Sequence, residues 1–164
     1  MIEIRKATYE DLVQIGHIEE TCFPTAEAAS YESFLHRYQV FPESFFVACD
    51  NNNPSTIVGF INGCVTNEQT IRDEMYDNSK LHDPNGAYQA VFGLCVLPTF
   101  QKQGIASKLM NILIEDARSK NRKGLILTCK ERLIPYYEKF GYVNHGISAS
   151  IHGNVVWYDM RLDF

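Results

Sequence analysis

Residues 101–107 combine residue types that suit the binding of a phosphate group. They read QKQGIAS, leave a predicted buried strand and open a predicted amphipathic helix. The first N–H groups of a helix have no acceptor within the helix, and together with the helix dipole they attract anions. Gly104 lets the backbone approach an anion closely, and Ala106 keeps the site open. Taken alone, the segment also fits an ordinary loop that enters an amphipathic helix.

Other common catalytic patterns are absent from the sequence. The ten glycines include no G-x-G-x-x-G and no G-x-x-x-x-G-K-[ST], and the five histidines show no H-E-x-x-H spacing. No G-x-S-x-G motif occurs, and Cys95 stands in an apolar run typical of a core strand. We therefore expect no metal site, no Rossmann or P-loop nucleotide site, and no serine or cysteine nucleophile. The cysteines include no C-x-x-C pair, which favours reduced, buried thiols.

The first half of the chain predicts a strand, then two helices, and then two strands joined by a turn. Ile2 and Ile4 alternate with charged residues, as in a strand, and Thr8 with Asp11 resembles a capping box that opens a helix. Ser30 is placed to cap a second helix with an apolar stripe. Two β-rich runs at 45–49 and 57–65 flank a turn-forming asparagine cluster, which predicts a hairpin.

The second half alternates strands with helices. Residues 67–87 predict a helix or an ordered loop, whereas 90–97 are continuously apolar and predict a strand in the middle of the sheet, with Gly93 as a bulge. The further predicted elements are a helix over 104–121, a strand at 125–127, a helix over 133–140 and strands near 143–149 and 155–162. This order indicates an α/β (α+β) protein with one mixed sheet and helices on both faces.

Length, charge and hydropathy restrict the class of protein. With 164 residues, 45% of them hydrophobic, the chain is long enough for one domain, residues 1–164, with its own core. The net charge of −5 argues against nucleic acid and against an anionic membrane as partners. The sequence has no apolar run of membrane-spanning length and no signal-peptide pattern. We expect a cytoplasmic protein, either a monomer or a homodimer.

Three segments carry a resemblance to a known family. They are Leu94-Cys95-Val96, Gln101-x-x-Gly104-x-Ala106 and Ile134-Pro135-Tyr136-Tyr137-x-x-x-Gly141-Tyr142. In this order they resemble the acetyl-CoA signature of the GNAT N-acetyltransferase superfamily. The resemblance extends over nearly the whole chain, and within the superfamily the chain is most similar to the arylalkylamine (serotonin-type) N-acetyltransferases. It implies the GNAT fold, a mixed, mostly antiparallel central sheet of about seven strands with helices on both faces.

The resemblance implies where acetyl-CoA binds. The backbone at Leu94, Cys95 and Val96 would pair with pantetheine like an added strand, and strand amides near Leu94 and Cys95 would stabilise the developing oxyanion. The pyrophosphate would lie on the amides that open the helix, those of Lys102, Gln103, Gly104, Ile105, Ala106 and Ser107. A neutral amine would attack the thioester directly within a ternary complex, without an acyl-enzyme.

The resemblance also implies the proton-transfer residues. Tyr137 stands at the family position that protonates the departing thiolate of CoA. An alkylammonium with a pKa of about 10.4 must lose a proton before it attacks. The vertebrate enzymes use two histidines for this, but this chain has Ala90 and Phe92 there. Insect relatives are thought to use a glutamate in the N-terminal substrate loop, and Glu27 occupies a similar place.

From these observations we expect an acetyl-CoA-dependent N-acetyltransferase that acts on a small, arylalkylamine-like primary amine. Three alternative acceptors remain open: a protein N-terminus, a lysine side chain and a polyamine. A different class also remains open, a non-catalytic acyl-CoA-binding domain, because the histidine pair is missing. Product identification would distinguish the acceptors, and the absence of turnover would indicate the binding domain.

Overall fold

Nine strands form two separate sheets in the computed structural model, which describes residues 1–164. The chain divides into two units. Unit 1 comprises Met1–Gly63 and Gly93–Leu113, and unit 2 comprises Cys64–Phe92 and Ile114–Phe164. The expected α+β class is therefore confirmed, but the strands form two sheets and not the single sheet of about seven strands that the sequence predicts.

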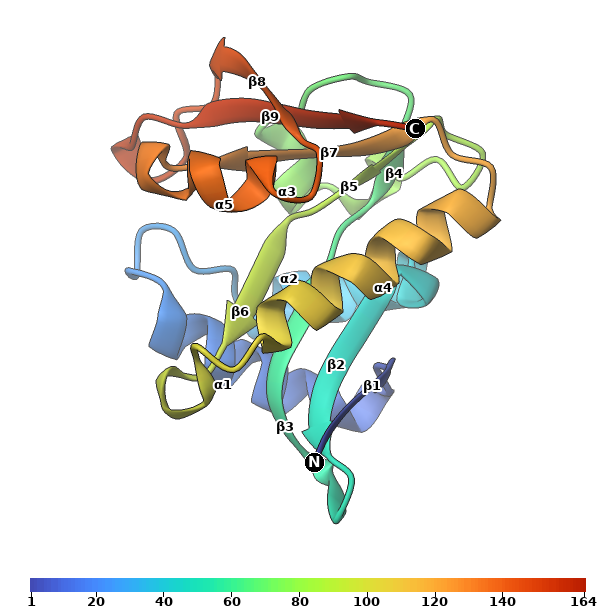
Figure 1. The fold of residues 1–164 in the computed structure, drawn as a ribbon, viewed down its shortest axis with the longest axis vertical. Coiled ribbons are helices and arrows are strands. Elements are labelled where there is room, and N and C mark those ends of the chain that lie inside the picture. Colours follow the sequence, from blue (N-terminus) through green and yellow to red (C-terminus); the bar gives the residue numbers. More distant parts are fainter. The chain divides into compact units, whose positions relative to one another are not determined.

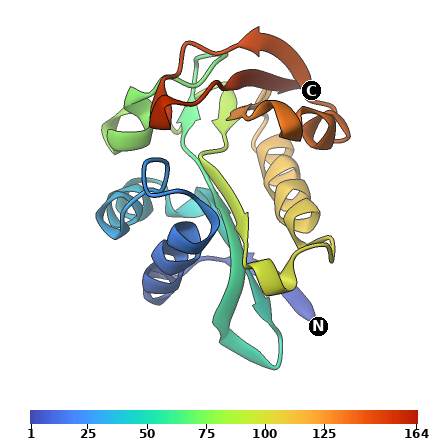
Figure 2. The same cartoon turned by 90° about the vertical axis from the view of Figure 1, so that its left-hand side faces the viewer.

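Unit 1 contains an antiparallel sheet in the order β1-β2-β3-β6. Its strands are β1 (Ile2–Lys6), β2 (Phe45–Asp50), β3 (Asn53–Asn62) and β6 (Gly93–Val96). Helices α1 (Leu12–Cys22) and α2 (Tyr31–Val40) lie on one face, and the beginning of α4 (Ile105–Ser119) lies on the other (Figure 2). The 3-10 turns are Tyr9–Asp11, Pro42–Ser44 and Pro98–Phe100. The predicted hairpin is confirmed, with its turn shortened to Asn51 and Asn52.

Local signals set the helix starts in unit 1. The predicted capping box at Thr8 and Asp11 is present, and the Ser30 hydroxyl accepts the Ser33 N–H at 3.2 Å. Behind these helices an aromatic core forms, in which Phe34 packs edge-on against Phe60 with ring centres 5.5 Å apart. Both rings are fully buried, and each contributes about 1.5–3 kcal/mol through burial. This packing supports the sheet that carries β6.

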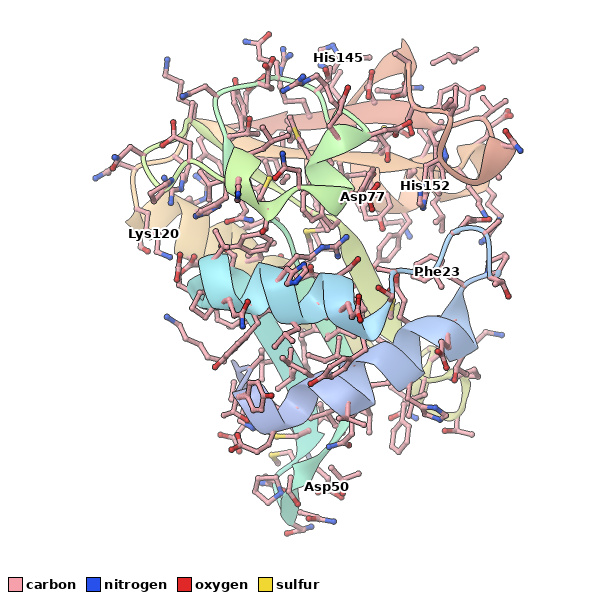
Figure 3. All side chains as sticks on the ribbon, turned by 180° about the vertical axis from the view of Figure 1, so that it is seen from behind. Phe23, Asp50, Asp77, Lys120, His145 and His152 are labelled. Carbon is pink, nitrogen blue, oxygen red and sulfur yellow. The ribbon has the colours of Figure 1, made fainter.

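Unit 2 contains a five-stranded sheet in the order β4-β5-β7-β9-β8. Its strands are β4 (Val65–Thr66), β5 (Tyr88–Ala90), β7 (Gly124–Cys129), β8 (Val143–Ile147) and β9 (Tyr158–Asp163). Only β5 and β7 pair in parallel. Helix α5 (Ile134–Glu138) and helix α3 (Glu74–Asp77) lie on opposite faces of this sheet (Figures 1 and 3). The 3-10 turns are Ser79–Leu81, Glu131–Leu133 and His152–Asn154.

The prediction of one continuous strand over 90–97 is wrong. Strand β5 ends at Ala90, and β6 begins at Gly93 in the other sheet. The Val91 N–H still donates to Ile126 (2.9 Å), whereas Gly93 pairs with Asn62. The segment divides because its two halves pair with different strands. Apolar character alone does not reveal such a division, since both halves are buried.

No helix of the structure is both long and apolar enough to cross a membrane.

Candidate functional site

Strand β6 lies at the edge of the unit 1 sheet. The Leu97 N–H donates to the Val58 carbonyl at 2.8 Å, and the antiparallel register continues through Cys95 opposite Phe60. Hydrogen-bonded pairs alternate along an antiparallel ladder, so the backbone groups of Cys95 face β3. Those of Leu94 and Val96 face the open edge. Of the three residues expected to pair with a further strand, Leu94 and Val96 are therefore the ones oriented for it.

The Val96 carbonyl already accepts two hydrogen bonds at this edge. Its donors are the Gln101 side-chain amide (3.0 Å) and the Cys22 thiol (3.4 Å). Gln101 thus ties the beginning of the predicted anion loop to the end of β6. The Leu94 N–H and C=O and the Val96 N–H are the groups that this edge can offer to an extended ligand.

The loop over 101–104 adopts the backbone shape that the glycine predicts. Gly104 has a φ of +79°, and Lys102 also has a positive φ of 65°. The Lys108 N–H donates to the Gly104 carbonyl (3.1 Å), so the first turn of α4 begins at Gly104. A Cβ at Gly104 would meet no atom within 4 Å. A side chain at Gly104 would therefore project into open space.

The side chain of Ile105 does not belong to this open surface. It is 2% exposed and anchors α4 in the core, whereas Lys102, Gln103 and Gly104 are exposed. Ala106 and Ser107 are half-buried. Among these predicted cofactor-binding residues, Ile105 can contribute only its backbone.

Glu27 is buried in the loop between α1 and α2, where its N–H donates to the Pro24 carbonyl at 2.9 Å. A second carboxylate, Glu19, holds this loop. Its Oε2 accepts the Ala29 N–H (2.9 Å), and its Oε1 accepts the Cys95 thiol of β6 (3.4 Å). Glu19 therefore joins the loop that carries Glu27 to the strand predicted to bind pantetheine.

Glu19 belongs to none of the motifs from which the site residues are predicted. The available signal is its position four residues after Ile15 on α1, which places a carboxylate on the buried face of that helix. An acidic residue on the buried face needs hydrogen-bond partners within the fold. Glu19 finds them in two separate segments of unit 1.

The thiols of Cys22 and Cys95 differ in pKa although they lie close together. The pKa of Cys22 is lowered, chiefly by a hydrogen-bonding interaction with the Cys95 side chain, while burial opposes this effect. The pKa of Cys95 is raised well above its usual value, first because the thiol is buried. None of the five cysteines forms a disulfide, and only Cys22 is half-exposed.

Tyr137 lies in unit 2 on α5, where it is half-buried. Its ring packs edge-on against Tyr136 (5.2 Å between centres) and Tyr142 (5.9 Å). Tyr136 is also half-buried, and its ring packs edge-on against Phe140, so it does not belong to the core. The core tyrosine is Tyr142, whose pKa is raised, first by its complete burial and then by the charge of Tyr137.

The structure thus groups the predicted site residues within two units. Unit 1 holds β6, the 101–104 loop, the beginning of α4 and Glu27, whereas unit 2 holds Tyr137. Phe92, which replaces an expected histidine, is the last residue of its segment of unit 2. The next residue along the chain is Gly93, the first residue of β6.

Known proteins resemble this one over most of its length. The model of the acetyltransferase (GNAT) family matches residues 12–142. Serotonin N-acetyltransferase of Mesocricetus auratus is 24% identical over 163 residues, which are 97% of this chain and 76% of that protein.

Solved structures share the fold at low sequence identity. The loading GNATL domain of CurA from Lyngbya majuscula has a TM-score of 0.80 at 15% identity, with 99% of this chain and 98% of that chain covered. A chain of the NatC complex bound to Gag peptide and CoA has a TM-score of 0.79 at 17% identity, with 99% and 98% covered.

Proposed function

Because the chain belongs to the acetyltransferase (GNAT) family, whose members use acyl-CoA, we propose that it transfers the acetyl group of acetyl-CoA to a small primary amine. The observation that carries this proposal is the open edge of β6, followed in the same unit by the 101–104 loop. An extended pantetheine can pair with the open edge of β6 like an added strand, and a pyrophosphate can bind at the 101–104 loop. We propose residues 1–164 as one such domain.

The orientation of β6 assigns the backbone roles. We propose that pantetheine pairs with the Leu94 and Val96 groups, and that the Leu94 N–H stabilises the oxyanion, because the Cys95 backbone faces Phe60. Cys95 contributes its side chain, which binds Glu19. The amides of residues 102–107 hold the pyrophosphate.

The proton transfers are assigned to side chains. In the proposed reaction a neutral amine attacks the thioester directly, the C–S bond breaks, and the Tyr137 hydroxyl protonates the departing thiolate. Glu27 remains a candidate acceptor for the proton of the amine. Its place in the loop held by Glu19 supports this role, since a fixed loop keeps the carboxylate in position.

The similarity to serotonin N-acetyltransferase along 97% of the chain supports an arylalkylamine acceptor. The fold shared with NatC, a complex solved with a peptide and CoA, leaves peptide N-termini as a second candidate. Lysine side chains, polyamines and a purely acyl-CoA-binding role are the remaining alternatives. We propose a cytoplasmic protein, monomeric or homodimeric.

A panel of acceptors tests the proposal. The protein would be incubated with acetyl-CoA and phenylethylamines, tryptamines, polyamines or short peptides, and the products identified by mass spectrometry. An acetylated arylalkylamine as the main product is the expected result. Product from polyamines or peptides alone would reassign the acceptor. Acetyl-CoA binding without any product would instead indicate the non-catalytic domain.

A further inference from the structure

Two thiols of unit 1 lie between the end of α1 and strand β6. Helix α1 packs against β6, and Figure 3 marks the end of α1 by Phe23, the residue after Cys22. The Cys22 thiol of α1 donates to the Val96 carbonyl of β6 (3.4 Å), and the Cys95 thiol of β6 donates to Oε1 of Glu19 on α1 (3.4 Å). Because Val96 follows Cys95 in β6, and Cys22 follows Glu19 by one helical turn, these two hydrogen bonds are neighbours.

The two thiols also interact with each other, and they differ in reactivity. Their hydrogen-bonding interaction lowers the pKa of Cys22, whose side chain is half-exposed. The pKa of Cys95 is raised well above its usual value, first by burial, then by Cys22 and by the charge of Glu19. The pair therefore joins an accessible thiol that ionises more readily to a buried thiol that stays protonated. The other three cysteines of the chain are buried.

Glu19 places a proton acceptor beside the buried thiol. Its side chain is 6% exposed, and its Oε2 accepts the Ala29 N–H (2.9 Å). A thiol is a weaker hydrogen-bond donor than an N–H or a hydroxyl group, so the contact with Cys95 compensates little for the burial of a carboxylate. The same contact puts a carboxylate oxygen 3.4 Å from the sulfur of a thiol that must lose its proton before it can react.

We propose that Cys22 and Cys95 form a peroxide-reactive pair, in which Cys22 is oxidised first and Cys95 then closes a disulfide between α1 and β6. Two side chains that already interact need only a small approach to form such a bond. The disulfide attaches the beginning of the 23–30 loop covalently to β6. The proposal does not depend on the acetyltransferase function, because it needs only the two thiols, Glu19 and a peroxide.

The oxidation proceeds in two steps. The Cys22 thiolate attacks one oxygen of hydrogen peroxide, the S–O bond forms, the O–O bond breaks, and the departing hydroxide takes a proton and becomes water. The Cys95 sulfur then attacks the sulfur of the Cys22 sulfenic acid. Glu19 accepts the Cys95 proton, and this proton converts the hydroxide released from Cys22 into a second water. Two thiols and one peroxide thus give one disulfide and two waters, with two electrons passing from the sulfurs to the peroxide.

Mass spectrometry of the peroxide-treated protein tests the proposal. The reduced full-length protein would be treated with hydrogen peroxide and digested without reduction. We expect one cross-linked peptide pair, that of Cys22 and Cys95, and an intact mass lower by about 2 Da. Dithiothreitol should restore the original mass. Treated wild type without this cross-link, or with another cysteine pair in its place, would overturn the proposal.

Two matched variants separate the two steps. C95A and C49A each remove a buried cysteine from a strand of the unit 1 sheet. C49A should still form the Cys22–Cys95 disulfide. C95A should stop at the Cys22 sulfenic acid, which dimedone captures at that residue. A sulfenic acid on Cys95 in C22S, or a disulfide between other cysteines in C95A, would contradict the order of the steps.

E19Q tests the proton acceptor. Glutamine keeps an oxygen for the Ala29 N–H but is a much weaker base, so we expect the sulfenic acid to form at the wild-type rate and the disulfide to close about tenfold more slowly. More dimedone should therefore be found on Cys22 in E19Q than in wild type. A purely structural contact would predict equal rates of closure, and that result would remove Glu19 from the second step.

Discussion

At the scale of single residues, contacts within the fold give side chains of the same type different environments. Tyr136 and Tyr137 are neighbours on one short helix and both are half-buried, but Tyr137 packs against the buried Tyr142 and Tyr136 packs against Phe140. Cys22 and Cys95 also differ, because the interaction with Cys95 lowers the pKa of Cys22, whereas burial raises that of Cys95. Residue type alone predicts neither difference.

We expect Y137F to lower turnover about 10²- to 10⁴-fold, because the phenol that protonates the thiolate is lost. The affinity for acetyl-CoA should change little. Y136F is the matched control, since it removes a hydroxyl from the adjacent residue of the same helix. Steady-state kinetics and calorimetric binding measure the two effects. Equal activity of Y137F and wild type would remove Tyr137 from the mechanism.

Among the five cysteines, Cys22 should react first with iodoacetamide. Its thiol is half-exposed with a lowered pKa, whereas burial raises the pKa of Cys129 to about 11. At mildly alkaline pH we expect labelling of Cys22 to be about tenfold faster than that of the other thiols. Peptide mass spectrometry measures the rates, and C22S should abolish the fast phase. Uniform labelling would contradict the assigned environment.

At the scale of elements, turns and termini decide what each strand or helix presents. Gly104, with its positive φ, directly precedes α4. The chain breaks its strand before Gly93, and β6 then forms the edge of the unit 1 sheet. Likewise, Asp11 joins β1 to the helical segment that follows, through hydrogen bonds from Arg5 and Thr8. Each of these positions can be tested by one substitution.

G104A should weaken acetyl-CoA binding about tenfold. An alanine at a φ of +79° strains the backbone by about 1–2 kcal/mol, and its methyl group would enter the open space proposed for the pyrophosphate. G146A is the control, because Gly146 also has a positive φ (96°) and open space around it, but lies in β8. Calorimetric titration of both variants measures the affinities. Equal losses in the two variants would contradict the anion loop.

D11N should lower the free energy of unfolding by about 1–3 kcal/mol at pH 7, because it breaks the hydrogen bonds of a buried carboxylate to Arg5. Burial acts to raise the pKa of Asp11, but the hydrogen bonds from Arg5 and Thr8 outweigh it and lower the pKa below its ordinary value. A lowered pKa gives stability that is present above the unfolded-state pKa and lost as the pH falls through the folded-state pKa.

Urea unfolding of wild type and D11N between pH 7 and pH 2 measures this contribution. The difference between the two proteins should be constant near neutrality and shrink in the acid range. A difference that stays constant to pH 2 would show that the Asp11 charge does not contribute.

At the scale of the whole molecule, binding of acetyl-CoA and stability are linked. A ligand that binds only the folded protein stabilises it by about 2.7 kcal/mol at one hundred times its Kd. For a chain of this length, this should raise the midpoint of thermal unfolding by about 5–10 °C. Pantetheine, which lacks the pyrophosphate, should have a much smaller effect at the same concentration. Equal shifts of the unfolding midpoint with both ligands would contradict the proposal that the protein binds the pyrophosphate.

Local sequence patterns are sufficient to predict most of the order of the elements, the caps at Thr8 and Ser30, the positive φ of the glycine before α4, and the family motifs. These depend on residues a few positions apart, so a local pattern suffices to predict them. Only the fold shows that 90–97 divides between two sheets, that Leu94 and not Cys95 faces the open edge, and that Glu19 accepts a hydrogen bond from the Cys95 thiol. Those outcomes depend on pairing and packing between distant segments, and no local pattern of hydropathy encodes which segments will meet.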